Sequence, residues 1–576
     1  MRNPEIARLF NEIADFLEVK DENPFRIRAY RRAAQAVEGL SEDIVAIAER
    51  SGLLDVPGIG KDLAAKIQEY LASGRVEYLE ELRKQIPAGV IEMMGIHGVG
   101  PKTAKHLYEQ AGVNSVKKLE ELAKANKLAG LPGIKAKTEE NILKGIAVWR
   151  SGRERMPLGT ALLLAETILE RLRDLKEVNQ IEAAGSLRRM KETVKDIDIL
   201  ITSNKPARVM DVFVGLPNVA EVVAHGETKS SVRLRESIAV DLRVVEPDCF
   251  GAALLYFTGS KQHNIRVREL AQRKGLKVSE YGVFNEKTNR RVAGKTEVEV
   301  YQAVGLPFIP PELREDGGEI EAALEGRLPT LVSLADIRGD LQMHTTWSDG
   351  AHALAELAEG VRAKGYQYMA VTDHSKSATV AGGMKDEQVL QMIAEVRALN
   401  KKMKGFRVLA GCEVDIRADG TLDFRDEILR QLDLVLVSVH SRFKMSREEM
   451  TARIIRGVQH PLVHLLGHPT GRLIGERGAY EVDMEAVLTA ARAAGIAVEI
   501  NASPSRLDLN DLHARRAKDL GIPIAINTDA HTIGQLDMMR FGVSVARRGW
   551  LTPKDVVNTW PEKQLVSWLE KKRSRA

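Results

Sequence analysis

The sequence is poor in aromatic residues, in cysteine and in long apolar runs. Aromatic residues make up 5% of the chain, and its two cysteines, Cys249 and Cys412, cannot build a disulfide framework. Together with the absence of a signal-peptide pattern, the scarce cysteine predicts a reducing, cytoplasmic setting. No apolar run reaches the roughly 18 residues that a membrane-spanning helix needs, so a membrane protein is not expected.

Net charge is also small. The 84 Lys and Arg against 80 Asp and Glu leave a formal charge of +4 at pH 7, so a broad basic surface for nucleic acid is not required. At roughly 150 residues per domain, the length of the chain suggests about four domains. Nine of the 13 histidines follow residue 340. This uneven spread indicates that the C-terminal part has a separate task.

The spacing of apolar residues divides the chain into three parts. Residues 1–150 predict short amphipathic helices, with apolar residues at helical spacing such as Ile6, Leu9, Phe10, Ile13, Phe16 and Leu17. A mixed part follows, with a helix at about 158–173 and strands at 197–202 and 237–245; prolines and glycines end it near residue 318. We place a linker at 319–336. From 337 onward helices alternate with strands, which predicts a parallel sheet or barrel; the strands are 368–371, 407–410, 432–439, 463–466, 497–500 and 522–526.

Three glycine-rich turns precede helices in the first part. They are VPGIGKDLAAKI at 56–67, GIHGVGPKTAKHL at 95–107 and LPGIKAKTEENI at 131–142. Glycine permits a tight turn, and the N–H groups that begin the next helix can bind a phosphate oxygen. This helix-hairpin-helix signature predicts contacts with the DNA backbone at Gly58, Gly60, Gly98, Gly100 and Lys102. A plain helical packing unit is the alternative, above all for the third copy, which lacks the second glycine.

Three aspartates form the next pattern. Asp196 and Asp198 lie two apart on a predicted strand, so both side chains point to one face, and Asp241 lies on a second strand. Converging carboxylates need a cation, and oxygen ligands suit Mg²⁺. Upstream, the segment GSLRR at 185–189 offers backbone, hydroxyl and guanidinium groups to a triphosphate. For the D-x-D pair alone, a solvated strand end is the alternative.

A block at 250–284, FGAALLYFTGSKQHNIRVRELAQRKGLKVSEYGVF, joins these motifs. With GSLRR, DID and VDLR, it resembles DNA polymerase beta and its relatives, the family X DNA polymerases, over about residues 1–318. The resemblance implies a helical lyase-like domain at 1–82, a DNA-binding domain at 83–152, a nucleotidyltransferase palm at 153–247 and a nucleotide-selecting subdomain at 248–318.

The same resemblance implies roles for single residues in a DNA-directed DNA polymerase. Asp196 and Asp198 would bind both Mg²⁺ ions, and Asp241 would bind the catalytic ion and help deprotonate the primer 3′-hydroxyl. The nucleotide-binding residues that it implies are Gly185, Ser186, Arg189, Tyr256, Phe257, Gly259, Asn264 and Arg268. Lys261 stands where polymerase beta has an acid, which puts contacts to base or sugar there in doubt.

Lys66 falls at the Schiff-base lysine of the family's lyase domain. A partly shielded lysine can attack the aldehyde of an abasic sugar, so the resemblance implies a deoxyribose-phosphate lyase activity. Asp62 and Arg26 stand where that domain has lysines. A solvated helix lysine or a phosphate contact is the alternative for Lys66.

In the C-terminal part, potential metal ligands follow the strands. Five histidines and several acids stand at successive strand ends, where barrel enzymes build their active sites. Histidine and carboxylate without cysteine favour Zn²⁺, Mn²⁺ or Fe. Cys412 is expected in the core, and four other histidines are expected at the surface or in packing: His352, His460, His464 and His513.

This pattern resembles the PHP (polymerase and histidinol phosphatase) domain at 337–576. The resemblance implies a distorted seven-stranded (β/α) barrel, up to three Mn²⁺ or Zn²⁺ ions and phosphoesterase chemistry. The ligands that it implies are His344, Asp349, His374, Glu413, His440, His468, Asp529 and His531, with Glu413 bridging two ions and Arg472 and Asn501 contacting phosphate. The family's His-x-His motif reads Gln342-Met343-His344 here, which predicts a weak or reshaped metal site.

These expectations together describe a monomeric polymerase that binds gapped or primed DNA and dNTPs and fills short gaps in repair. The second site would act as a 3′→5′ exonuclease, a 3′-phosphatase or an abasic-site endonuclease. Two other classes stay open. A phosphatase of the histidinol type leaves residues 1–318 without a task, and a non-catalytic DNA-binding scaffold leaves the three aspartates unexplained.

Overall fold

The computed structural model describes residues 3–38, 40, 43–56, 58–94, 96, 99–125, 127–129, 131, 134, 138–139, 142–143, 146, 155–475 and 477–574. Its backbone contacts divide into two compact units. The first holds Met1–Met156, Lys195–Ile197 and Pro206–Arg243, and the second holds Pro157–Val194, Asp198–Lys205 and Val244–Ala576. In the described part of the chain, no helix is long and apolar enough to cross a membrane.

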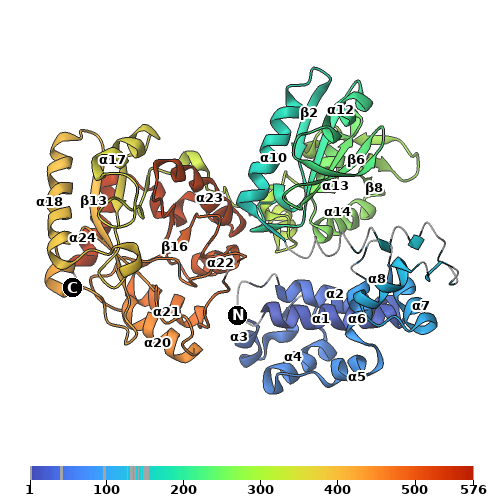
Figure 1. The fold of residues 1–576 in the computed structure, drawn as a ribbon, viewed down its shortest axis with the longest axis horizontal. Helices are drawn as coiled ribbons and strands as arrows, with labels where there is room; N and C mark the ends of the chain where they lie inside the picture. Colours follow the sequence, from blue (N-terminus) through green and yellow to red (C-terminus); the bar gives the residue numbers. More distant parts are fainter. Residues whose placement is uncertain are drawn as a thin grey trace. The chain divides into compact units, whose positions relative to one another are not determined.

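The first unit begins with short helices, blue in Figure 1. They are α1 (Asn3–Val19), α2 (Pro24–Glu38), α3 (Ile44–Glu49), α4 (Lys61–Ser73), α5 (Glu77–Gln85), α6 (Ala88–Met93), α7 (Pro101–Ala111) and α8 (Val116–Lys124). The six apolar side chains that predicted helix α1 are at most 7% exposed and belong to one hydrophobic core. Their spacing places them on one face of the helix, which packs against α2.

A mixed region of helices and antiparallel strands follows, with β1 (Met156–Pro157) and β3 (Thr193–Val194) as short strands. Helix α10 (Leu158–Arg173) confirms the predicted range and buries Leu158, Ala161, Ala165, Ile168 and Leu172. In the second unit β2 (Val178–Ala183) pairs with β4 (Asp196–Ser203). In the first unit β5 (Val219–His225), β6 (Lys229–Leu234) and β7 (Ala239–Val244) form a meander after α12 (Pro206–Val214). Directly after β7, the amide of Val245 donates to the carbonyl of Ile201 in β4 at 2.9 Å.

A small subdomain continues the second unit. Its elements are α13 (Phe250–Thr258), α14 (Lys261–Arg273), β8 (Leu276–Ser279), β9 (Gly282–Asn285), β10 (Arg291–Ala293), α15 (Glu297–Ala303), η3 (Pro311–Leu313) and α16 (Glu319–Leu324). The segment 319–336, for which we predicted a linker, is instead packed: Ile320, Ala323 and Leu331 belong to the core of this subdomain. Glu319 is fully buried and accepts from His263 at 2.7 Å.

The rest of the chain folds into a parallel barrel, yellow to red in Figure 1. Seven strands follow one another in sequence order: β11 (Gly339–Asp340), β12 (Tyr368–Val371), β13 (Arg407–Asp415), β14 (Leu434–Ser438), β15 (Leu465–Leu466), β16 (Ala497–Asn501) and β17 (Ile524–Asn527). An isolated bridge between Met343 and Ala530 joins the segments that follow the first and last strands. Strands buried on both faces read as continuous apolar runs, which is why the sequence predicted six of the seven. It missed the short β11, and β13 continues to Asp415, beyond the predicted end at residue 410.

Helices surround this barrel: α17 (Leu354–Ala363), α18 (Asp386–Lys402), α19 (Asp426–Leu429), α20 (Arg447–Val458), α21 (Met484–Ala494), α22 (Asp511–Asp519), α23 (Met539–Arg548) and α24 (Glu562–Arg573). Leu565 and Leu569 of α24 share a core with Tyr368, Leu409 and other side chains of the strands. Because all strands are parallel, their carboxyl ends meet at one edge of the barrel.

Candidate active sites

The first candidate site lies on strands β4 and β7. Asp196 opens β4 with Asp198 two residues on, and Asp241 is the third residue of β7. Burial raises the pKa of Asp196; the charge of Lys195 opposes this rise, and the negative charge of Asp241 adds to it. The carboxylate of Asp241 has Lys229 Nζ at 3.4 Å. Asp196 and Asp241 therefore feel each other's charge, as ligands of a shared cation would.

Gly185 brings the segment 185–189 against Asp198. Its φ is +63°, and a Cβ added there would lie 2.7 Å from Asp198 Oδ2. The amide of Ala184 donates to the backbone carbonyl of Asp198 at 2.8 Å. Only glycine combines this backbone conformation with such a close approach. The short helix α11 (Gly185–Arg188), which carries Ser186, thus starts beside one of the three acids.

The two arginines of GSLRR have different partners. Arg189 donates through Nε to Glu315 Oε1 at 3.0 Å and through Nη1 to the carbonyl of Thr258. Arg188, which we expected beside Arg189 as a triphosphate group, instead forms a two-pronged ion pair with Glu297 at 2.7 and 2.9 Å. It also donates to Thr258 Oγ1 at 2.8 Å. Arg188 therefore ties the segment 185–189 to α13 and α15.

The end of α13, the turn after it and the start of α14 hold the predicted nucleotide-selecting residues. Tyr256 and Phe257 pack edge to face with ring centroids 5.1 Å apart, and Tyr256 is 38% exposed. Gly259 has φ +68°, and a Cβ there would meet Arg189 Nη1 at 3.2 Å. Asn264 donates from Nδ2 to the carbonyl of Tyr256 at 2.7 Å, while its buried Oδ1 has no hydrogen-bond partner. The structure thus brings this turn and Arg189 together.

Two further residues of the same block lie on α14. Arg268 donates from Nε to the carbonyl of Asn264 at 3.2 Å. Lys261, where polymerase beta has an acid, is the first residue of α14 and is exposed. The N-cap of this helix is Ser260, whose side chain accepts from the amide of His263.

In the N-terminal helices, two of the three glycine turns end at described helix N-termini. Gly60 caps α4 and Gly100 caps α7, neither with a side-chain hydrogen bond to the first turn, and a Cβ at either would meet nothing within 4 Å. Gly58 has φ +88°, and Lys102 is exposed on the first turn of α7. Gly98 and most of the third turn lie outside the described residues.

Lys66 lies in the middle of α4. Its side chain is 13% exposed, and its Nζ pairs with Asp62 Oδ1 at 2.6 Å. The ammonium group also lies 5.3 Å from the centre of the Tyr78 ring. An attack on an aldehyde would first have to break the pair with Asp62.

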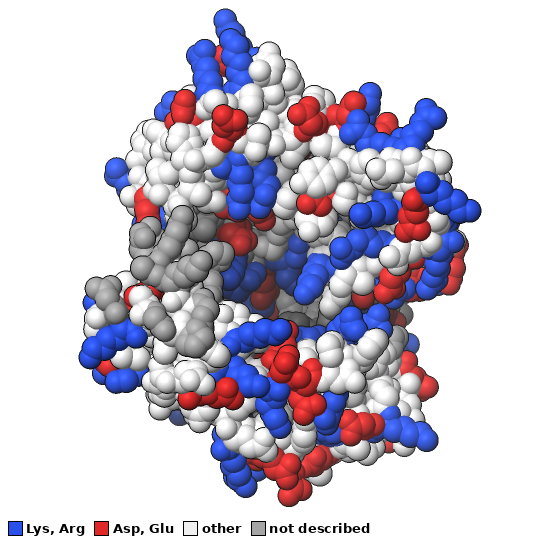
Figure 2. Space-filling model, turned by 90° about the vertical axis from the view of Figure 1, so that its right-hand side faces the viewer, with Lys and Arg blue, Asp and Glu red and all other residues white. Residues whose placement is uncertain are grey.

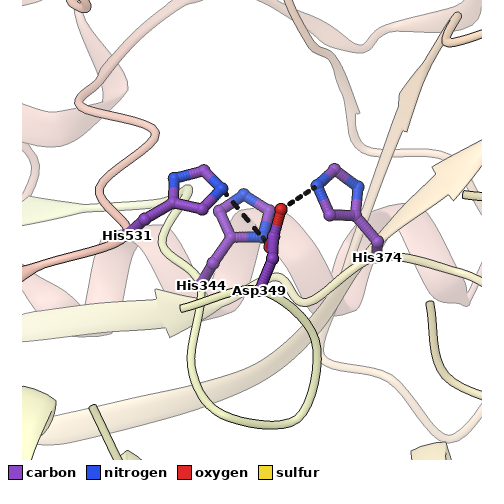
Figure 3. Close-up of side chains that lie close together, drawn as sticks. All are labelled: His344, Asp349, His374 and His531. Atoms are coloured by element: carbon purple, nitrogen blue, oxygen red, sulfur yellow. Dashed lines mark ion pairs between the residues drawn. The ribbon is translucent and has the colours of Figure 1, made fainter. Parts of the chain in front are cut away.

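The second candidate site lies at the carboxyl edge of the barrel. Among the described residues, three groups could each hold a metal ion, with potential ligand atoms within 4.8 Å of one another. The first group is His344, Asp349, His374 and His531; in Figure 3 Asp349 lies between His374 and His531, at 3.7 and 3.3 Å. The other two are His374 with Glu413 and His440, and His344 with Glu413 and Asp529.

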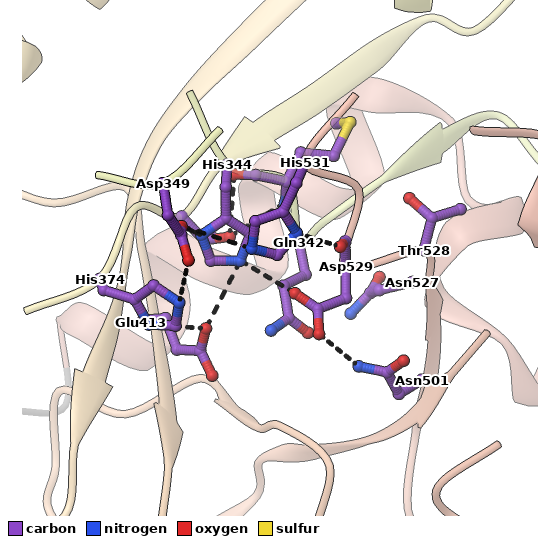
Figure 4. Close-up of polar contacts among 12 residues, drawn as sticks. Gln342, His344, Asp349, His374, Glu413, Asn501, Asn527, Thr528, Asp529 and His531 are labelled. Carbon is purple, nitrogen blue, oxygen red and sulfur yellow. Dashed lines mark hydrogen bonds and ion pairs between the residues drawn. The ribbon is translucent and has the colours of Figure 1, made fainter. Parts of the chain in front are cut away.

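Glu413 stands at the centre of this cluster, here named the histidine cluster: His344, Asp349, His374, Glu413, His440, His468, Asp529 and His531. Its Oε1 lies 2.8 Å from His468 Nε2 and 3.2 Å from His440 Nε2. Its Oε2 lies 3.3 Å from His374 Nδ1 and 3.5 Å from His344 Nε2 (Figure 4). A carboxylate with both oxygens facing imidazoles is suited to bridge two ions.

Burial and neighbouring charges shift the pKa values of several histidines in the histidine cluster. Burial lowers the pKa of His440, but the charge of Glu413 and a hydrogen bond to Asp415 outweigh it and raise that pKa to about 10. For His344, burial is likewise outweighed by Asp529, and the pKa rises to about 9. For His374, burial prevails and lowers the pKa to about 4.

Several buried atoms of the histidine cluster lack a hydrogen-bond partner. They include Nδ1 of His344, His374 and His468 and Oε2 of Glu413. Gln342 is fully buried, and neither Oε1 nor Nε2 of its amide has a partner. In Figure 4 this amide faces the side of the cluster where Glu413 and Asp529 lie. Buried polar groups are normally paired. The unpaired ring nitrogens, the carboxylate oxygen and the amide oxygen of Gln342 could therefore serve as ligands of a cation.

The structure also shows supporting residues that the sequence did not single out. Asp415 accepts from His440 Nδ1 at 2.9 Å, and its spacing of two from Glu413 on one strand was the available signal. Arg472, which we expected to contact phosphate, instead bonds to Glu192 Oε2 at 2.7 Å and to the carbonyl of Arg506 at 2.9 Å. Asn501, expected in the same role, donates to Asp529 Oδ2 at 3.1 Å.

The histidines outside the pattern have other partners where the structure describes them. His464 is fully buried and accepts from the amide of Val435, as expected of a packing residue. His352 pairs with Glu356 and His460 with Asp426. Cys412 is fully buried, as predicted.

Sequence models of four domain families match the chain. They are a helix-hairpin-helix domain at residues 1–76, a SAM-like helix-hairpin-helix tandem at 90–147, a DNA polymerase beta thumb at 253–315 and a PHP domain at 340–503. The matched segments coincide with the glycine turns, the subdomain after the acid strands and most of the barrel.

Whole proteins extend these matches. The DNA polymerase/3′-5′ exonuclease PolX of Bacillus subtilis (strain 168) is 40% identical over 573 residues, which cover 99% of this chain and 100% of that protein. A probable phosphatase of Thermoanaerobacter sp. (strain X514) is 32% identical over 246 residues, 40% of this chain and 96% of the phosphatase. DNA polymerase lambda of Rattus norvegicus is 27% identical over 320 residues, 50% of this chain and 52% of that polymerase.

Proposed function

The chain belongs to the family X DNA polymerases that carry a C-terminal PHP domain, and we propose that it fills short gaps in DNA and processes 3′ ends at a second site. The observation that carries this proposal is the presence of two separate ligand sets in one chain. One is the electrostatically coupled Asp196 and Asp241, and the other is the histidine cluster around Glu413.

At the polymerase site, Asp196, Asp198 and Asp241 would hold Mg²⁺. Two such ions stabilise the entering and leaving oxygens of an in-line phosphoryl transfer. The protein's own groups orient the nucleotide: Ser186 and Arg189 hold the triphosphate, and Tyr256, Phe257 and Gly259 crowd the sugar. Asn264 and Arg268 contact the nascent pair and the template.

At the PHP site, the histidine cluster would hold up to three Mn²⁺ or Zn²⁺ ions. Such ions polarise a phosphoryl oxygen and supply a hydroxide nucleophile near neutral pH. The substrate is a 3′ end: a terminal nucleotide, a 3′-phosphate or an abasic site. The alternative is a PHP domain that serves only as a scaffold. That alternative gives no reason for the buried atoms of His344, His374 and Glu413 that lack a hydrogen-bond partner.

DNA itself would be held through helix N-termini rather than through a broad basic patch. On the face shown in Figure 2, Lys and Arg side chains are interspersed with Asp and Glu. The N-termini of α4 and α7, which have glycine N-caps and no side-chain cap, would offer amides to backbone phosphates, together with Gly58, Gly60, Gly100 and Lys102. Gly98 is proposed for the same contact from the sequence alone. The protein would act as a monomer in the cytoplasm on gapped or primed DNA.

An assay on a one-nucleotide gap tests the proposed function. With Mg²⁺, Mn²⁺ and dNTPs, the protein should extend a primer that ends in a 3′-hydroxyl by one nucleotide. A primer that ends in a 3′-phosphate should be extended only after the phosphate is removed. Hydrolysis of small phosphomonoesters without any primer extension would instead favour the histidinol-type phosphatase.

Gln342 gives a prediction about metal preference. Its amide oxygen, with the carboxylates of Glu413 and Asp529, makes the site at His344 richer in oxygen than a His-x-His motif would, and oxygen ligands favour Mn²⁺ over Zn²⁺. Gln342→His should raise the affinity of one site for Zn²⁺ by about tenfold, measured by calorimetric titration of the metal-free protein. Gln342→Leu, which offers no donor atom, is the matched control and should weaken that site for both metals. Equal Zn²⁺ affinity in all three proteins would contradict the prediction.

Lys66 gives a prediction about lyase activity. If its amine forms a Schiff base with an abasic sugar, borohydride should trap the protein on DNA with a deoxyribose-phosphate end. Lys66→Ala should reduce the trapped product at least about tenfold, because the nucleophile is lost. The control is Lys61→Ala, which removes an exposed lysine from the same helix. Equal trapping in both variants would exclude Lys66 as the nucleophile.

A further inference from the structure

Arg548 is the last residue of α23, in the barrel domain, yet its side chain reaches the segment 185–189. The side chain is 5% exposed. Its Nη1 donates to the backbone carbonyl of Arg189 at 2.8 Å and to Glu315 Oε1 at 3.0 Å, and its Nη2 donates to Asp511 Oδ2 at 2.6 Å. One buried guanidinium therefore joins the barrel to both Arg189 and the carboxylate that Arg189 uses.

Glu315 is shared by two arginines. The same Oε1 atom accepts from Arg189 Nε and from Arg548 Nη1, both at 3.0 Å. Burial raises the pKa of Glu315, but the charges of Arg548, Lys191 and Arg189 outweigh it and lower that pKa to about 2. Glu315 is thus ionised throughout the neutral range. It competes with any other anion for the guanidinium of Arg189.

We propose that Arg548 is a positioning residue for the nucleotide site: by sharing Glu315, it weakens the hydrogen bond between Glu315 and Arg189, so that Arg189 can bind the triphosphate of an incoming nucleotide. This inference rests on the proposed polymerase function. Without Arg548, Arg189 and Lys191 would be the remaining cations of the three that stabilise the charge of Glu315, and each would interact with it more strongly. A charge-assisted hydrogen bond tightens when a competing donor is lost, and Arg189 would also lose the donor to its backbone carbonyl.

The barrel domain offers a matched control on the same helix. Arg540 of α23 forms a two-pronged ion pair with Glu166 of α10, at 2.7 and 3.2 Å. This pair also joins the barrel to the preceding part of the chain, but it involves neither Glu315 nor Arg189. Arg540→Met therefore tests whether any weakened contact of α23 affects nucleotide binding.

The experiment measures single-nucleotide gap filling by the full chain at varied dNTP concentration. Arg548→Met should raise the KM for dNTP about tenfold, with kcat changed less than about threefold. Arg548→Lys keeps a cation beside Glu315 and should stay near the wild-type KM. Glu315→Gln added to Arg548→Met should bring KM back toward the wild-type value, because the competing charge is gone. Arg540→Met should leave KM unchanged.

Three results would overturn the inference. They are an unchanged KM in Arg548→Met, an equal rise in Arg540→Met, or no recovery on adding Glu315→Gln. If Arg548→Met does not fold, Arg548→Lys and the double variant still decide: a raised KM in Arg548→Lys or in the double variant contradicts the inference. A wild-type protein that fills no gaps would refute the proposed function instead, so the two failures are distinguishable.

Discussion

Asp241→Asn is expected to abolish gap filling, by at least about a thousandfold in kcat/KM, while 3′-end processing continues. The change keeps the size of the side chain and removes the negative charge that contributes to the raised pKa of Asp196. It leaves Lys229, 3.4 Å away in the wild type, with less opposing charge. Both effects weaken cation binding where the transferred phosphoryl group would be stabilised, and a thousandfold loss corresponds to about 4 kcal/mol.

The control for this prediction is an exposed acid that follows β7 in the chain. Asp248 pairs with Arg291 at 3.0 Å and with Lys295 at 3.2 Å, and no ligand role is proposed for it. Asp248→Asn should keep gap filling within about threefold of the wild type, as expected of a surface pair. Primer extension on a one-nucleotide gap measures both variants. Gap filling by Asp241→Asn within tenfold of the wild type would contradict the proposal that the three aspartates bind the catalytic cations.

Glu413→Gln is expected to have the opposite pattern. It should reduce 3′-end processing at least about a thousandfold and leave gap filling within a fewfold of the wild type. Glu413 belongs to two of the three potential metal groups and faces four imidazoles within 3.5 Å. Replacing its charge with a neutral amide would weaken the hold of Glu413 on a cation, so the purified variant should also retain fewer bound metal ions. Elemental analysis and release of a labelled 3′-terminal nucleotide are the two measurements.

Loss of a buried charge can also act through stability, so a second buried acid serves as the control. Asp433 precedes β14, at the opposite end of the barrel strands from the histidine cluster, and pairs with Arg397 at 3.0 Å. Asp433→Asn should lower the melting temperature without changing metal content. Full 3′-end processing by Glu413→Gln would rule out the histidine cluster as the active site for this reaction. An equal loss of metal in Asp433→Asn would show that the metal loss in Glu413→Gln results from lower stability.

The sequence predicted the elements that carry local signals. The range 158–173 and the range 368–371 match α10 and β12, because an apolar face at helical spacing and a short apolar run are properties of consecutive residues. The ligand types of the histidine cluster could also be read from the sequence. Once the strands are parallel, residues just after them must meet at one edge of the barrel.

The segment 319–336 is a case in which local sequence signals gave a wrong prediction. The prolines and glycines that precede it, together with Pro329, predicted a linker, yet Glu319 is fully buried and bonds to His263, and Ile320 packs into the preceding core. Local composition identifies residues that favour turns. It does not indicate whether the side chains between them pack against a part of the chain that is distant in sequence.

The sequence by itself predicted the fold classes, and it placed the proposed roles of the three aspartates and of the histidine cluster, because each depends on residue type and spacing along the chain. Only the tertiary structure decided how the arginines are used. Arg188 bonds to a residue 109 positions away, Arg472 to one 280 away, and Arg548 to the carbonyl of Arg189 across 359 positions. An ion pair between distant residues produces no periodic pattern in the sequence. The tertiary fold determines which surfaces are buried together, and a buried guanidinium must then pair with an acceptor that lies close to it.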